Sequence, residues 1–418
     1  MLKAGALFYA IVVTLLIAVI SSSLILYAYF NRSQLQSLGL QEKVLINAAS
    51  GINLLLAGGS SFPLDEIQII DLYGEYSDSV MVLRKQWGAF EIAVSKAFSK
   101  GFVSMKTAQI GANIHDDPHI ALYLADQDKP LSLCGKTEIK GTCYLPKSGA
   151  KRAYIEGQSF MGNHLINGET KISERLLPEV NKDLLESNLR YFKKDIQKND
   201  SVLYIEEVEV NDSVTRSFSQ RTLLLYSDHE INLENKYYHG NIRVVSAHSV
   251  YVPRTANLQD VLIYAPVVEI EDDFTGNLQV FATDSIQVGK RCSLNYPSVI
   301  ALLRTDKSKG NIELTIGERS ILTGVLLGYQ DISINQLKIA IGKEVLIKGQ
   351  VYAKGYVELK GKVAGNLTCD KFILNTPSSV YDNHLLNATI DYSGLSTHFT
   401  GVSLLQHAQS KQIVKWLY

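Results

Sequence analysis

The sequence predicts a mainly β protein with an N-terminal transmembrane helix, a small α+β domain and then an irregular parallel β-helix, or solenoid, carrying one helical insertion. Three observations predict this class. Residues 4–30 are apolar and uncharged, apolar residues recur every six positions over 339–365, and a helical pattern interrupts the repeats at 172–200. The expected domains are an anchor at 1–30, an α+β domain at 31–125, the solenoid at 126–383 and a tail at 384–418.

The charge-free run at 4–30 is long enough to span a bilayer with some tilt. A cleavable signal peptide has a shorter apolar core and a small-residue cleavage site, so an uncleaved anchor is the better interpretation. No later stretch stays apolar long enough for a second span. We therefore expect a single-pass inner-membrane protein whose soluble part is periplasmic.

The α+β domain is expected to begin with a continuation of the membrane helix. Apolar residues over 35–57 recur mostly at spacings of three and four, and Gly-Gly-Ser-Ser at 58–61 ends the pattern. Alternation then returns over 79–111, as in Val80 and Val82, and predicts an antiparallel meander.

The solenoid prediction rests on IGKEVLIKGQVYAKGYVELKGKVAGNL at 341–367. Val345, Val351, Val357 and Val363 recur every six residues, and glycines at 349, 355 and 361 mark bends. As a single strand this stretch would extend for about 90 Å, so the chain must turn repeatedly. IGERSILTG at 316–324 and VGKRCSL at 288–294 begin in the same way. Upstream, apolar residues recur at three times this spacing, which suits a three-faced coil.

Two segments depart from the repeat. PEVNKDLLESNLRYFKKDIQKND, within 172–200, has helical spacing, and this helix would either cap the solenoid or bind a partner, with capping preferred. The tail ends in LLQHAQSKQIVKWLY, for which we expect a short helix that caps the last coil or docks elsewhere.

Composition narrows the function classes. The net charge of −1 gives no electrostatic reason to expect nucleic acid as a partner. Of the four cysteines, Cys134 and Cys143 bracket a short loop; they either form a disulfide or stay reduced in the core, and the sequence leaves both open. Cys292 and Cys369 are expected in the core.

Two polar clusters contain residue types that serve in metal binding or catalysis. HDDPH brings together His115, Asp116, Asp117 and His119, but Pro118 disfavours a helical metal site, so we expect a polar loop. Glu269, Glu271, Asp272 and Asp273 are acidic residues like those that pectin-lyase-like β-helix enzymes use with calcium, and we expect a solvated turn. The sequence therefore predicts no catalytic, cofactor-binding or metal-binding residue and no cofactor.

Residues 316–367 resemble the bactofilin family of polymer-forming β-helix proteins. The same run resembles the hexapeptide repeat of left-handed β-helix acyltransferases, but no histidine base lies between His248 and His384. The layout of the N-terminal part is similar to that of type IV pilins and minor pseudopilins, without their Gly-Phe processing site or helix glutamate. These resemblances imply self-association, or assembly through the N-terminal helix.

The sequence favours a bacterial, membrane-anchored, non-enzymatic envelope scaffold or partner-binding protein. We expect it to bind the membrane through residues 4–30. We expect outward residues such as Tyr352 and Tyr356 to contact protein partners or other copies of the chain. The alternatives are a minor pilin-like component of a pilus or secretion apparatus, and a β-helix carbohydrate-active enzyme. Convergence of Glu269, Asp272 and Asp273 on a basic residue in a groove would favour the enzyme. A helix that continues past residue 50 with the meander packed on it would favour the pilin-like protein.

Overall fold

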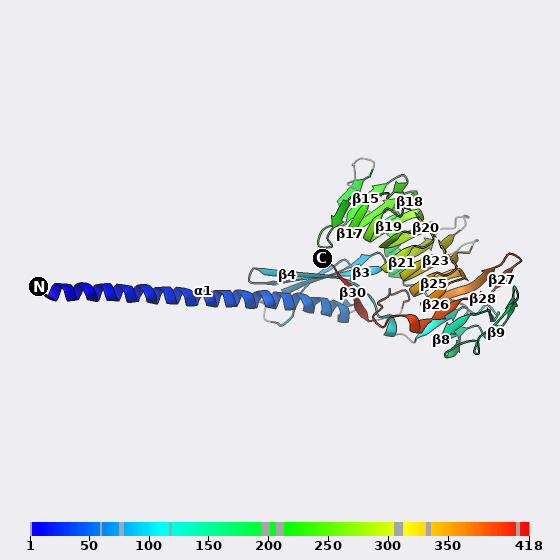
Figure 1. Cartoon of the computed structure of the whole chain (residues 1–418), viewed down its shortest axis with the longest axis horizontal. Coiled ribbons are helices and arrows are strands. Elements are labelled where there is room, and N and C mark those ends of the chain that lie inside the picture. The colour runs from blue at the N-terminus through cyan, green and yellow to red at the C-terminus, as the bar shows by residue number, and fades with distance from the viewer. Residues whose placement is uncertain are drawn as a thin grey trace. The chain divides into compact units, whose positions relative to one another are not determined.

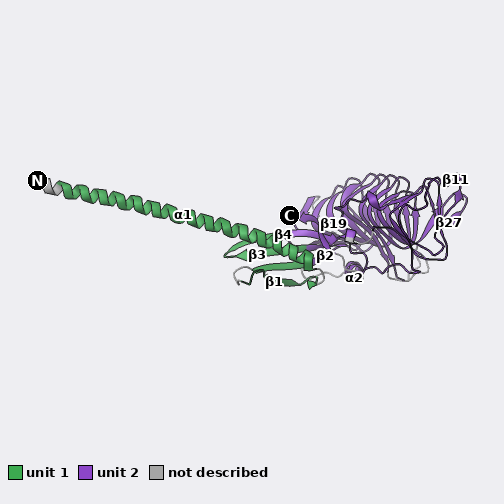
Figure 2. Ribbon diagram, turned by 90° about the horizontal axis from the view of Figure 1, so that it is seen from below, with its two compact units in different colours: residues 1–84, 93–106 green, residues 85–92, 107–418 purple. Residues whose placement is uncertain are grey.

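The structure is a computed structural model. It describes residues 2–58, 61–74, 79–116, 119–193, 201–205, 213–304, 312–331, 336–406 and 410–417. The chain forms two compact units, one of residues 1–84 and 93–106 and the other of residues 85–92 and 107–418 (Figure 2). The boundary between the units passes through three strands of one sheet.

Unit 1 contains the longest element, the helix α1 (Leu2–Gly58), which Figure 1 shows as one uninterrupted helix. It is long and apolar enough to cross a membrane, as predicted. Every residue from Gly5 to Gln36 is exposed, whereas Val44, Ala48, Ile52 and Leu55 are buried. The helix therefore has a bare apolar half and a half that packs on the sheet of unit 1.

The packed half of α1 approaches the sheet closely at Gly51. A Cβ on Gly51 would lie 2.7 Å from Val80 Cγ1 and 3.0 Å from Ser95 Cβ, so only glycine allows this approach. The sheet has the order β1-β2-β3-β4-β30. Its strands are β1 (Ile67–Asp71), β2 (Ser79–Trp87), β3 (Phe90–Ser99), β4 (Phe102–Ala112) and β30 (Lys411–Leu417). Strands are thus present where the alternation over 79–111 predicted them.

The C-terminal segment corrects one prediction. The short helix expected at the chain end is instead the strand β30, which pairs antiparallel with β4 through Ile413 and Ile110. A partner strand far earlier in the chain decides this conformation, because pairing outweighs local preference when a segment completes a sheet edge.

Unit 2 is built mainly from parallel strands. Their hydrogen-bonded pairings connect into one closed ring. The earlier strands of this set are β5 (Ile120–Leu124), β7 (Glu138–Lys140), β8 (Thr142–Leu145), β12 (Thr170–Ile172), β13 (Ser201–Tyr204), β14 (Ser213–Arg216), β15 (Leu223–Ser227), β16 (Ile231–Asn232), β17 (Tyr237–Ser246) and β18 (Ser249–Val252). The later ones are β19 (Asn257–Ile270), β20 (Thr275–Val288), β21 (Ser293–Arg304), β22 (Glu313–Ile316), β23 (Ile321–Gln330), β24 (Lys338–Ile341), β25 (Leu346–Leu359), β26 (Lys362–Asn375), β27 (Val380–Asp382) and β29 (Thr389–Asp391).

Smaller elements complete unit 2. They are the sheet β28-β6-β9 (His384–Leu386, Leu131–Cys134, Ala150–Arg152), the pair β10 (Tyr154–Ile155) and β11 (Gln158–Ser159), the helix α2 (Lys182–Leu189), and the 3-10 helices η2 (Ile114–Asp116), η3 (Arg190–Lys193) and η4 (Tyr392–Gly394). The helix predicted within 172–200 is therefore present as α2 and η3, and Asn181 caps it by accepting from Asp183 N at 3.0 Å. Residues 194–200 lie outside the described part.

The core of unit 2 lies between parallel ladders of apolar side chains. One ladder joins Val250, Val268, Ile286, Leu314, Ile339, Val357 and Phe372. A second joins Leu225, Val244, Ile263, Val280, Ile300, Leu326, Val351, Leu367, Leu122 and Cys143. All of these side chains belong to one buried cluster. The mainly β class, the parallel strands and the buried six-residue register are thereby confirmed.

The stacking order does not follow the chain. The late strand β26 pairs with the early strand β5, through Leu367 and Leu122, and β29 pairs with β7 through Ile390 and Ile139. Glycines allow close stacking at one corner, where Gly324, Gly349 and Gly365 are successive Cα partners with φ between +142° and +148°. This is the backbone region that only glycine occupies readily.

Candidate functional site

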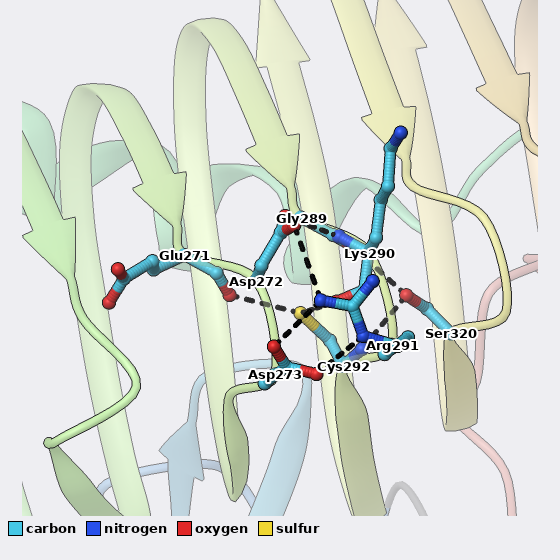
Figure 3. Close-up of polar contacts among 8 residues, drawn as sticks. All are labelled: Glu271, Asp272, Asp273, Gly289, Lys290, Arg291, Cys292 and Ser320. Carbon is cyan, nitrogen blue, oxygen red and sulfur yellow. Dashed lines mark hydrogen bonds and ion pairs between the residues drawn. The ribbon is translucent and has the colours of Figure 1, made fainter.

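The acidic cluster occupies a turn of unit 2. Asp272 and Asp273 lie between β19 and β20, and Lys290 and Arg291 lie in the next turn, between β20 and β21 (Figure 3). Arg291 Nε donates to Asp273 Oδ1 at 2.7 Å, and Nη2 donates to Oδ2 at 2.8 Å. The Arg291 guanidinium also lies 3.7 Å from Asp272 Oδ2. The structure thus brings two of the four acidic residues around one arginine.

The other two acidic residues have different surroundings. Glu271 Oε2 accepts from the backbone N–H of Arg254 at 2.8 Å. Glu269 belongs to β19 and lies across the ladder from Tyr251 and Gln287. Asp272 Oδ1 accepts from Lys290 N at 2.8 Å. The carboxylates of Glu271, Asp272 and Asp273 therefore accept hydrogen bonds from residues of the neighbouring turns.

The turns stack into a column because each has the same backbone conformation as the next. Asp273, Arg291, Arg319 and Glu344 have φ between +56° and +64°. Backbone bonds connect them: Asp273 N donates to Lys290 O at 2.8 Å, Arg291 N to Glu318 O at 2.9 Å and Arg319 N to Lys343 O at 3.0 Å. The repeated VGKR, IGER and IGKE segments are these turns, so the sequence repeat reflects the turn geometry.

The ion pairs described along this column join side chains of adjacent turns. The hydrogen bond from Arg291 lowers the pKa of Asp273, and the Asp273 carboxylate in turn raises the pKa of Arg291. Arg319 Nε pairs with Glu344 Oε2 at 3.0 Å further along the column. Both side chains of the Asp273–Arg291 pair are nearly half exposed, at 44% and 49%, so solvent screens their attraction.

The HDDPH segment places two histidines beside one tyrosine. His115 Nδ1 lies 3.3 Å from Tyr392 Oη, and the ring of His119 lies edge-on, 5.0 Å from the Tyr392 ring. Asp117 and Pro118, and the side chain of Asp116, lie outside the described part of the chain. Among the described residues no group of three or more His, Cys, Asp or Glu has a metal-binding arrangement.

The structure records all four cysteines as free and buried. Cys134 packs in a small cluster with Ile155 and Leu374, whereas Cys143 belongs to the main core. Burial raises the pKa of Cys143 to about 12, and it raises the pKa values of Cys134, Cys292 and Cys369 as well. Of the two possibilities left open by the sequence, the structure therefore has the reduced thiols.

Tyr352 corrects a second prediction. It was expected on an exposed face, yet it is only 3% exposed, and its hydroxyl donates to Pro178 O at 3.0 Å. The segment before α2 covers it, and no repeat pattern indicates which distant segment covers an outward position. Tyr356 is half-buried, 5.3 Å from the ammonium of Lys371.

A buried polar cluster on the outer side of the ladders was not predicted. Tyr264 stacks on Phe281, with ring centroids 4.8 Å apart, and its hydroxyl donates to Asn188 of α2 at 2.8 Å. The guanidinium of Arg243 lies 3.6 Å from the centroid of the Tyr191 ring. Tyr264 and Phe281 are ladder partners 17 residues apart, so the longer repeat spacing upstream of the six-residue repeat was the available signal.

Residues next to this buried polar cluster also bind the connection between β2 and β3. Asn188 Nδ2 donates to Gly88 O at 3.0 Å, and Ala89 N donates to Gln279 Oε1 at 2.8 Å. Trp87 meets Phe218 edge-on at 5.2 Å. The hydrogen bonds of Asn188 with Gly88 and Tyr264 hold α2 against the strands. No family model, curated protein or solved structure matches the chain.

Proposed function

We propose that the protein is a membrane-anchored, non-enzymatic component of the bacterial cell envelope that acts as a scaffold or binds partner proteins. In this proposal α1 crosses the inner membrane and the rest of the chain is periplasmic. The single observation that carries the proposal is the division of α1 into a bare apolar half and a half buried against its own sheet.

The bare half of α1 needs an apolar environment. Its large side chains, including Leu15, Leu16 and Ile17, are all exposed, and residues 4–30 carry no charge. Contiguous apolar surface of this size marks a membrane or protein interaction site. A helix satisfies its own backbone hydrogen bonds and so can cross lipid.

The ladders of unit 2 support a β-helix as the rigid part of the scaffold. Val250, Val268 and Ile286 are successive partners in one ladder, and each step along the chain equals three of the six-residue units. A step of this size corresponds to one coil of three short faces. At the turn column, the side chains of Asp273 and Arg291 pair with each other, as do those of Arg319 and Glu344. This arrangement favours a surface for partners over a catalytic groove.

Membrane extraction and thiol labelling test the proposal. The protein should stay in the membrane fraction after alkaline carbonate washing. Leu176→Cys, at a position 81% exposed, should react with an impermeant maleimide in cells whose outer membrane is permeabilised. The wild-type chain is the control, because its four cysteines are buried. Labelling only after the inner membrane is lysed would contradict the periplasmic placement, and carbonate release would contradict the anchor.

A specific observation favours the pilin-like alternative. Beyond the charge-free run, α1 still exposes Leu35, Leu38, Leu45 and Ile46, each more than half exposed. The helix also continues past residue 50 and packs on strands of unit 1. Exposed apolar residues on a helix outside the membrane support packing against the helices of other subunits.

Disulfide crosslinking distinguishes the two proposals. Leu38→Cys should give covalent dimers in membranes after mild oxidation if α1 helices assemble. Ile52→Cys is the matched control, since Ile52 is fully buried against the sheet. Dimers through Leu38→Cys alone favour the pilin-like assembly. Absence of dimers in membranes that contain the protein at its native level would remove that alternative and leave the scaffold.

A further inference from the structure

The sheet of unit 1 is apolar on both faces. Val80 and Ser95 lie against Gly51, so they mark the face that packs on α1. Because successive side chains of a strand point to opposite faces, Met81 and Phe98 point away from the helix. Strands that are apolar on both sides are typical of a sheet that is covered on both faces.

The face that points away from α1 is continuous over four strands. Ile67 and Ile69 of β1 are Cα partners of residues of β2 on this face. The turn between β3 and β4 has two residues, which places Val103 opposite Phe98. We call this surface the outer apolar face. Its residues are Ile67, Ile69, Met81, Leu83, Val94, Phe98, Val103 and Met105.

Much of the outer apolar face is uncovered. Ile67 and Ile69 are 60% and 70% exposed, and Val103 and Met105 are 54% and 44% exposed. A contiguous apolar surface that spans several strands marks an interaction site. Because α1 is the one α-helix among the described residues of unit 1, the described part of this unit supplies a helix to one face of the sheet only.

The direction of the strands fixes the level of the outer apolar face along α1. Arg84 Nη1 donates to Phe62 O at 2.9 Å, past the C-terminal end of the helix. Strand β2 therefore runs toward that end, and β3 runs back in the opposite direction. By the rises of strand and helix, Val103 and Met105 lie level with about residues 44–51 of α1.

The exposed side of α1 offers a matching apolar surface at this level. Leu45 and Ile46 are 53% and 51% exposed, whereas Val44 and Ala48 on the other side of the helix are buried. Anchors of one sequence cross a bilayer with the same orientation and at the same height. Leu45 and Ile46 of one copy therefore lie at the level of the outer apolar face of its neighbour.

From these two surfaces we propose that α1 of one copy packs on the outer apolar face of a second copy. Each chain gives its helix to one neighbour and receives a helix from another on its sheet, which builds an arc or a ring in the plane of the membrane. Charge is complementary at the same level, because Glu42 of α1 is exposed and Lys100, in the β3–β4 turn, lies level with about residue 40. The inference rests on the proposed membrane anchor, which keeps the copies parallel.

Disulfide crosslinking between two differently tagged full-length chains tests this contact. One chain carries Leu45→Cys and the other carries Val103→Cys, and both are oxidised in membranes with copper phenanthroline. The mixed dimer should form at about ten times the yield of dimers within either single variant, because the contact pairs unlike surfaces. Wild-type chains are the background, since their four cysteines are buried. Dimers of Leu45→Cys with itself in equal yield would indicate packing of helix on helix and would overturn the proposal.

A charge placed on the outer apolar face checks the surface. Ile69→Lys in the Val103→Cys chain should lower the yield of mixed dimer by about tenfold, because the contact would bury the lysine without a partner. Ile172→Lys is the matched control, at a strand position of unit 2 that is 66% exposed, and it should leave the yield unchanged.

Retention of the chain in carbonate-washed membranes is measured first. Release of the chain would contradict the anchor. If the chain is retained but gives no mixed dimer, or if Ile69→Lys leaves the yield unchanged, the contact between helix and sheet is wrong while the anchor stands.

Discussion

Arg291 and Asp273 join two successive turns of unit 2 by a two-pronged ion pair, with donor–acceptor distances of 2.7 and 2.8 Å. Bidentate pairs of this kind fix geometry as well as charge. Because the pair joins two turns of the column, its contribution to stability is the property to measure.

Removal of the arginine should give a pH-dependent loss of stability. The pKa of Asp273 is lowered in the folded state, chiefly by the hydrogen bond from Arg291. Its contribution is therefore present above the unfolded pKa of about 3.9 and is lost as the pH falls through the folded value. Arg291→Gln should lower the melting temperature slightly at pH 7, by about 1 °C, since the pair is exposed. At an acid pH below the folded pKa of Asp273, the variant and wild type should melt together. An equal shift at both pH values would contradict this linkage.

The stacked glycines should be among the least tolerant positions. A Cβ on Gly365 would overlap the backbone of Gly349, and φ there is +148°. Gly365→Ala should cost about 2 kcal/mol or more in the free energy of unfolding. Gly149→Ala is the matched control, because Gly149 also has positive φ, at +66°, but open space around it. Thermal unfolding in detergent compares them, and equal losses would mean that conformational strain alone, without the clash, explains the effect.

The helix of unit 1 should detach when Gly51 is enlarged. Gly51→Leu would overlap Ser95 and Val80, and overpacking of this kind costs about 1–3 kcal/mol. Gly39→Leu, on the same helix with nothing within 4 Å, should keep or raise stability. Limited proteolysis between residues 60 and 105 reports the difference. Equal protection of the two variants would show that α1 does not pack closely at Gly51.

The thiols should be unreactive in the folded protein. With the pKa of Cys143 raised to about 12, almost no thiolate is present at pH 8. A disulfide-exchange reagent such as Ellman's should therefore titrate no cysteine rapidly in the native chain and four after denaturation. Reductant should leave the melting temperature unchanged. A fall in melting temperature with reductant would instead indicate a disulfide between Cys134 and Cys143.

Periodic features of this chain could be predicted from the sequence. Val345, Val351, Val357 and Val363 are all buried, because their six-residue spacing follows directly from the strand and turn geometry. The end of α1 at Gly58 was likewise indicated by its glycine and serine run. Such features depend on neighbours that are close in sequence or repeated.

Features that depend on distant segments could not be predicted. Tyr352 is covered by residue 178, and β30 becomes a strand only because the edge of β4 accepts it. Glu271, Asp272 and Asp273 lie at a turn as predicted, whereas Glu269 lies in β19. The arginine partner of Asp273 lies in the next turn, 18 residues further along the chain.

The pairing of β5 with β26 has a consequence for biosynthesis. When the ribosome has made residues 120–145, the strands on which they stack, within residues 362–391, lie far downstream and do not yet exist. This end of unit 2 can therefore close only after almost the whole chain has been made. Until then its apolar strand edges are uncovered, which exposes this segment of the nascent chain to aggregation.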